Sequence, residues 1–229
     1  MTAQTKSQFY GYFSWVLLAL VLAGFVPAGF MRPGGVTAAP LLLHVHGAVF
    51  LAWFLLLCLQ LRLITTERVG LHQALGKSSV ILAVAMVVLG YLVIRSAYAK
   101  PEFSIAGMTP AASVMFPFTD IVNFVIAYAL GLLNRRNAQV HKRFMILAGV
   151  LILDPAISRL VITIGGPPPL ILVLELGIFG ALLIHDWRTL RRPHWATLTG
   201  LALFVLAMLA KLLLAPGPQW QRFVETAFG

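Results

Sequence analysis

The sequence predicts an all-α membrane protein, a polytopic bundle of about seven transmembrane helices. Of its 229 residues, 60% are hydrophobic and only 10% are charged, whereas about 25% of the residues in an ordinary soluble domain are charged. Apolar runs long enough to cross a bilayer core, which takes about 20 residues, recur along the chain. These runs are continuous rather than alternating, which excludes transmembrane β-strands. We therefore expect a single transmembrane helical domain over residues 1–229.

The first four expected spans are bounded by charged residues or proline. They are residues 13–30, 41–61, 78–94 and 111–133. The second begins directly after Pro40, and proline suits the first turn of a helix because the N–H that it lacks has no partner there.

The last three expected spans are residues 144–164, 168–184 and 196–215. In the first of these, Pro155 follows Asp154 near the midplane, and a proline inside a helix removes one hydrogen bond and clashes with the preceding turn. We therefore expect a kink at this point. The short connection at residues 165–167 predicts that the fifth and sixth spans are neighbours in space, since consecutive elements usually pack together.

The basic residues predict the orientation. Eleven of the 17 lie near the N-terminus or in the second, fourth and sixth connections: Lys6, Arg62, Arg68, Lys77, Arg135, Arg136, Lys142, Arg143, Arg188, Arg191 and Arg192. Only four lie on the other side: Arg32, Arg95, Lys100 and Arg222. Because cytoplasmic loops carry the excess of Lys and Arg, we expect a cytoplasmic N-terminus and an outer C-terminus in a bacterial inner membrane. The net charge of +10 then reflects topology, so the expected partner is the lipid bilayer and not a nucleic acid.

Five charged residues lie inside the expected spans: Asp120, Asp154, Arg159, Glu175 and Lys211. Charged side chains are costly in a bilayer and usually face the bundle interior, and most of these five lie in the outer half at a rise of about 1.5 Å per residue. We expect Arg159 and Glu175 to form a structural ion pair. The alternative is a site for an ion, a proton or an anionic head group. We expect Lys211 to snorkel to the outer surface, with pairing to Asp120 or Glu175 as the alternative.

Two histidines, His44 and His46, open the second span. Residues two apart on a helix point in different directions, so this pair would bind one metal together only if the first turn were unwound. His46, Trp53 and Gln60 repeat every seven residues and form one polar stripe. We therefore expect His46 to point inward, as a hydrogen-bonded core residue or as a cofactor ligand.

The cytoplasmic side carries a repeated pattern in which an arginine precedes a histidine by a few residues. The pairs are Arg68 with His72, Arg136 with His141 and Arg191 with His194, and His185 lies in the same layer. The simplest interpretation is that these side chains anchor helix ends at the head groups. The alternative is that two histidines on facing helices, His72 and His141 first, bind a metal or a haem iron.

Several short motifs in residues 41–187 resemble those of a family of uncharacterised bacterial multi-pass membrane proteins. The motifs are His44-x-His46 with Trp53 and Gln60, His72-Gln-Ala-Leu-Gly76, His141-Lys-Arg-Phe-Met145 and Pro155-Ala-Ile-Ser-Arg159. This family is distantly similar to b-type cytochromes and to cytochrome oxidase assembly proteins.

The resemblance implies a respiratory membrane, with haem b or copper as a cofactor for electron transfer or oxidase maturation. A two-haem cytochrome of this type has histidine pairs on both sides of the membrane, whereas the outer side here has only His44 and His46. At most one haem, on the inner side, is therefore implied. Two alternatives stay open: an accessory or scaffold subunit of a larger membrane complex, and a small-molecule or ion transporter that uses the outer charged residues. The sequence names no catalytic residue.

Overall fold

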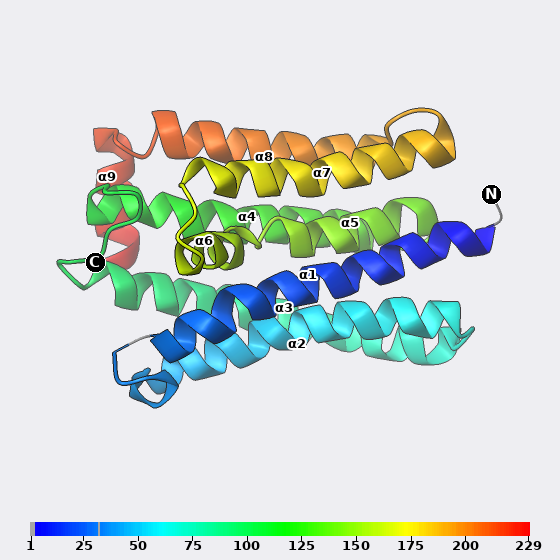
Figure 1. Cartoon of the computed structure of the whole chain (residues 1–229), viewed down its shortest axis with the longest axis horizontal. Coiled ribbons are helices and arrows are strands. Elements are labelled where there is room, and N and C mark those ends of the chain that lie inside the picture. The colour runs from blue at the N-terminus through cyan, green and yellow to red at the C-terminus, as the bar shows by residue number, and fades with distance from the viewer. Residues whose placement is uncertain (1–2, 32) are drawn as a thin grey trace.

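The apolar runs fold into helices, as the computed structural model shows (Figure 1). It describes residues 3–31 and 33–229, with side chains from residue 8 onward. The side chain of Lys6 and all of Arg32, both used to predict the orientation, lie outside the described residues. In the described part of the chain there are nine α-helices, one short 3₁₀ turn at Val36–Ala38 and no strand.

The first four spans are confirmed as helices that extend beyond the apolar runs. They are α1 (Ala3–Met31), α2 (Leu41–Thr65), α3 (Val69–Tyr98) and α4 (Pro110–Leu133). The sixth and seventh spans correspond to α7 (Pro169–Leu190) and α8 (Trp195–Leu213). Because α3 begins nine residues before the apolar run that starts at residue 78, His72 lies within its first turn rather than in a loop.

The fifth span is divided into α5 (Ala138–Val150) and α6 (Asp154–Thr163), which are bent by 44° relative to each other. Asn137 caps the start of α5, since its side-chain oxygen accepts hydrogen bonds from the N–H groups of Gln139 and Val140. The break precedes Pro155, which has no N–H to donate to the carbonyl of Leu151. The kink expected at this proline is therefore confirmed as a full interruption of the helix.

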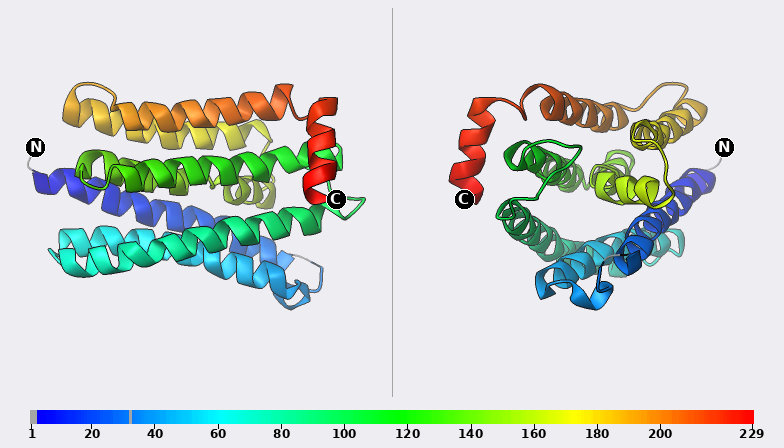
Figure 2. Two further views of the ribbon diagram at one scale, coloured as in Figure 1. Left: turned by 180° about the vertical axis from the view of Figure 1, so that it is seen from behind. Right: turned by 60° about the vertical axis from the view of Figure 1, so that its left-hand side comes forward.

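Among the described residues, six helices are long and apolar enough to span a membrane, and the number of spans is seven if α5 and α6 together count as one. The broken span lies in the middle of the bundle, between α1–α3 on one side and α7–α8 on the other (Figures 1 and 2). α5 contacts α1, α2, α4 and α8, and α6 contacts α1 and α7. Residues 146–153 are all buried, as expected for an apolar segment enclosed on every side.

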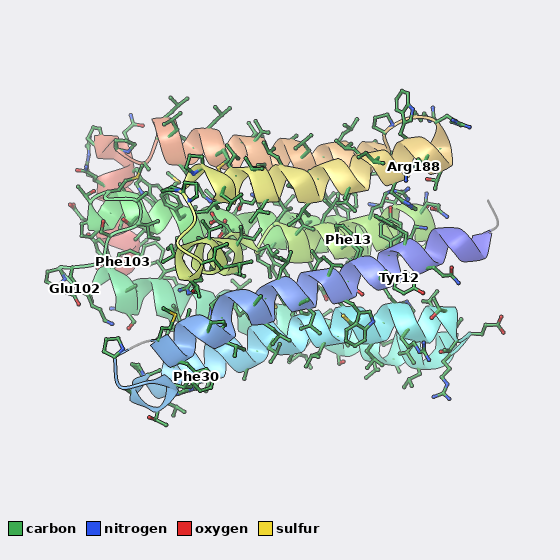
Figure 3. The ribbon with its side chains drawn as sticks, viewed as in Figure 1. Tyr12, Phe13, Phe30, Glu102, Phe103 and Arg188 are labelled. Atoms are coloured by element: carbon green, nitrogen blue, oxygen red, sulfur yellow. The ribbon has the colours of Figure 1, made fainter. Side chains whose placement is uncertain are left out.

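The two ends of the bundle differ in what they carry. The start of α1 and the α2–α3, α4–α5 and α7–α8 connections lie at one end of the bundle, here called the basic end, and Arg188 lies there (Figure 3). Glu102 lies at the opposite, C-terminal end (Figure 3). Between them the outer surface carries many exposed apolar side chains, such as Ile81, Val173 and Leu206, which suits contact with lipid.

A ninth helix, α9 (Pro218–Phe228), lies across the C-terminal end at a steep angle to the bundle (Figure 2). Trp220 Nε1 donates to the Ala111 carbonyl oxygen at 2.8 Å, and the Tyr91 hydroxyl donates to the Ala227 carbonyl oxygen at 2.9 Å. The sequence prediction missed this helix because it is short and amphipathic, with no apolar run of spanning length.

Glycine allows a close helix contact between α1 and α6. A Cβ atom on Gly24 would collide with the backbone carbonyl of Ala156. The two backbones can therefore approach only because Gly24 has no side chain, as is common where membrane helices pack tightly.

Candidate functional site

The structure brings His72 of α3 and His141 of α5 together at the basic end. Their ring centroids are 6.4 Å apart and their planes are nearly perpendicular, at 84°. Both side chains are half-buried. Each lies in the first turn of its helix, so two residues that are far apart in the sequence reach the same depth from neighbouring helix ends.

Both rings have their Nδ1 atom in contact with a polar group of a neighbouring helix. Nδ1 of His141 is 2.8 Å from the carbonyl oxygen of Gly131, which can only accept, so this nitrogen carries the proton. Nδ1 of His72 contacts the side-chain amide of Gln60 on α2. With its nitrogen toward His72, the amide also donates to the His72 carbonyl oxygen at 3.1 Å and accepts from the Gly76 N–H at 3.0 Å. In each ring Nε2 is the nitrogen that remains for a ligand.

The other two histidines of the expected cytoplasmic layer serve helix packing and capping. The ring of His185 stacks on Phe9 with centroids 3.8 Å apart and packs edge-on against Tyr10. Nδ1 of His194 accepts the Ala196 N–H at 3.1 Å and so caps α8. Burial and the nearby Arg143 lower the pKa of His194, which favours the neutral ring that capping requires.

A buried ion pair between Arg143 and Asp186 lies at the same end and was missed by the sequence analysis. Nε and Nη2 of Arg143 donate to one carboxylate oxygen of Asp186 at 3.0 and 2.5 Å, and Nη1 donates to the Gln139 carbonyl oxygen at 2.8 Å. The second carboxylate oxygen accepts from the His194 N–H at 3.1 Å and the Thr197 hydroxyl at 2.6 Å. With both oxygens bonded, the pair joins α5, α7 and α8 as a structural clamp.

This clamp corrects the role expected for Arg143. Its position in the sequence predicts a basic residue of the connection between two spans, yet its side chain is 3% exposed and that of Asp186 is fully buried. The signal present in the sequence was an acidic residue at the end of one span and an arginine at the same end of another.

His44 and His46 lie on different sides of α2. α2 is helical from Leu41, so its first turn is not unwound. His44 is exposed, whereas Nδ1 of His46 is buried and has no hydrogen-bond partner among the described residues. Trp53 is buried and Gln60 reaches His72, so the polar stripe faces the interior as predicted. This geometry does not place His44 and His46 at one shared metal site.

The charged residues in the C-terminal half of the bundle pair differently from the prediction. Lys211 Nζ on α8 is 2.6 Å from an Asp154 carboxylate oxygen on α6 and 3.4 Å from one of Asp120 on α4. Helix side chains lean toward the N-terminus of their helix, which directs Lys211 back into the bundle. The expected snorkelling to the outer surface is therefore wrong, and the alternative pairing with Asp120 is confirmed.

The expected ion pair between Arg159 and Glu175 is also wrong. Arg159 is exposed on the bundle surface, where it donates to the Pro155 carbonyl oxygen at 2.8 Å and lies over the Phe25 ring. Glu175 points the other way, into the bundle, and only 6% of it is exposed. Arg159 therefore faces Phe25 of α1 rather than Glu175 of α7, and the sequence does not indicate this rotation of the helix.

Glu175 lines a small cavity together with the residues that Lys211 joins. The cavity offers about 20 Å³ to water-sized molecules, and about 10–15 Å³ on this measure is enough for one water. Its polar lining consists of Asp120, Asn123, Asp154, Glu175 and Lys211. It lies where α4, the α5–α6 break, α7 and α8 meet.

The cavity and the histidine pair lie in opposite halves of the bundle. Along α4, Asp120 lines the cavity and Gly131 accepts the hydrogen bond from His141. At about 1.5 Å per residue, these two positions are about 17 Å apart. In the part of the chain that the structure describes, no group of three or more His, Cys, Asp or Glu residues is arranged to hold a metal ion.

The fold and the intramembrane polar groups define the class, a polytopic helical membrane protein that contacts the lipid bilayer. No protein-family model matches the chain, and neither a curated protein nor a solved structure matches it.

Proposed function

We propose that the protein binds haem iron or copper between His72 and His141 and serves electron transfer or oxidase maturation in a respiratory membrane. The observation that carries this proposal is the 6.4 Å separation of the two imidazole centroids across α3 and α5. The sequence pattern indicates the same two residues, and the motif resemblance implies the same cofactors.

The separation of the rings matches two imidazoles on opposite sides of one metal. A metal–imidazole bond is about 2.0–2.1 Å long, and the ring centroid lies about 1.1 Å beyond the nitrogen. Two opposed imidazoles therefore have centroids about 6.3 Å apart, whereas two tetrahedral ligands have them about 5 Å apart. The observed 6.4 Å is close to the first of these separations, so His72 and His141 would be the residues that hold a haem iron or a copper ion.

The contact of Nδ1 in His141 supports metal binding through Nε2. Histidines that bind metals usually donate their other N–H to a carbonyl or carboxylate, which fixes the ring and makes it a better ligand. The carbonyl of Gly131 holds His141 in this way. For His72, Nδ1 instead accepts from the Gln60 amide, so this contact positions the ring without accepting a proton from it.

The protein's own contribution is to orient the two rings at the edge of the bundle. Bound iron or copper supplies a one-electron redox centre. Both histidines lie in first helix turns beside the basic end, so such a centre would be near water and accessible to a redox partner on that side.

The test is the metal content and absorption spectrum of the purified full-length protein. We expect about one iron or copper per chain, a Soret band if the metal is haem iron, and loss of the metal in both His72→Ala and His141→Ala. The matched control is His44→Ala, an exposed histidine, which should keep the metal. Protein without stoichiometric iron or copper, or retention of the metal in both variants, would overturn the proposal.

A further inference from the structure

The cavity between α4, α6, α7 and α8 contains more negative than positive charge. Its lining has three carboxyl groups, on Asp120, Asp154 and Glu175, and one amine, on Lys211. Fully ionised, these four groups carry a charge of −2. Arg159 interacts with Asp154 from the bundle surface and reduces the excess to −1. A buried excess charge in a bilayer is costly, so the set requires one more positive charge.

Glu175 is the carboxyl group that lacks a partner. Lys211 is bonded to Asp154 and Asp120, whereas Glu175 makes no hydrogen bond or ion pair with another described residue. Only 6% of Glu175 is exposed, and its side chain lines the cavity. A buried polar group without a partner costs about 1–3 kcal/mol and more when it is charged. The missing positive charge is therefore needed beside Glu175.

The geometry favours a proton over a metal cation. The carboxyl groups are not arranged to hold a metal ion, and the cavity has room for about one water. A water beside Glu175 can carry a proton to and from the carboxyl group.

We propose that this cavity is a proton-binding site in which Glu175 holds one exchangeable proton. With that proton the five groups sum to zero: two carboxylates are balanced by Lys211 and Arg159. The charged groups that face Glu175 are Asp120 from α4, Asp154 from α6 and Lys211 from α8. The proton exchanges by way of Asp154, whose side chain is 19% exposed compared with 5% for Lys211. The site is separate from the histidine pair and does not depend on a bound metal.

Infrared spectroscopy of the full-length protein in nanodiscs tests this directly, because a protonated carboxylic acid has its own C=O stretching band. We expect this band at pH 7 in the wild type, a shift of the band in D₂O, and loss of the band in Glu175→Gln. The matched control is Glu102→Gln, which changes an exposed glutamate and should keep the band.

Four results would overturn the proposal. The first is absence of the band in the wild type, and the second is failure of the band to shift in D₂O. The third is loss of the band in Asp120→Asn but not in Glu175→Gln. The fourth is loss of the band when a choline salt in the buffer is replaced by the Na⁺ salt. The first, second and fourth are measured on the wild-type protein, so the proposal can fail even if a variant does not fold.

Discussion

Replacement of Asp186 by alanine tests the structural clamp at the basic end. The change removes both acceptor oxygens of a carboxylate that is fully buried. Arg143 then remains as a cation with 3% exposure and without its counter-charge. The His194 N–H and the Thr197 hydroxyl also lose their acceptor.

The size of the effect follows from this environment. Removing one partner of a buried ion pair costs about 3–5 kcal/mol. Arg143 retains two hydrogen bonds to Gln139, at 2.8 and 3.2 Å, which lowers the cost, whereas the two orphaned donors raise it by about 1–3 kcal/mol each when fully unpaired. We expect the free energy of unfolding to fall by about 4 kcal/mol.

Reversible unfolding in mixed micelles, followed by circular dichroism, measures this loss. Glu102→Ala is the control, because an exposed surface change stays within about 0.5 kcal/mol. The double variant Arg143→Met with Asp186→Leu should recover part of the stability, because it leaves no buried charge without a partner, whereas the His194 N–H and the Thr197 hydroxyl still lack their acceptor. A loss below about 1 kcal/mol in Asp186→Ala would refute the clamp.

Three further predictions concern other contacts. The pKa of His194 is lowered in the folded protein, so the contribution of this residue to stability is present above the unfolded pKa of about 6.5 and is lost as the pH falls. Unfolding midpoints measured from pH 8 to pH 5 should show this decline. The variant His194→Asn keeps a capping side chain that does not titrate, so it should show a smaller decline. Gly24→Ala places a Cβ atom against the Ala156 carbonyl and should cost about 1–3 kcal/mol in unfolding free energy, whereas an unchanged value would show that α1 and α6 are not tightly packed. Gln60→Leu removes the group at Nδ1 of His72 and should weaken metal affinity about 10–100-fold in a metal titration. Gln60→Glu keeps a polar group there and should retain the affinity. Equal metal affinities in Gln60→Leu and the wild type would exclude an orienting role for Gln60.

Most of the fold could be predicted because run length alone identifies a membrane helix. The break before Pro155 was also predictable, since it has a single local cause. α9 was not, because its helical pattern is short and amphipathic and depends on contacts such as Trp220 with Ala111. The predicted helix ends differ from the observed ones where polar residues such as His72 continue the helix beyond the apolar run.

The candidate site was predictable in part. The spacing of arginine and histidine at helix starts indicates His72 and His141. Both helices start at the same end of the bundle, so the topology places these two histidines at equal depth. The sequence could not tell which charges pair within the bundle, since this depends on helix rotation and on the 44° bend. The direction of Lys211 was nevertheless available from the lean of helix side chains toward the helix N-terminus.

X-ray absorption spectroscopy at the metal edge of the purified protein tests the central claim most directly. If His72 and His141 bind one metal, the spectrum will show two imidazole nitrogens in its coordination shell, and each single alanine variant that retains any metal will show one. A bound metal with no imidazole, or two imidazoles that persist in His72→Ala, would contradict the assignment.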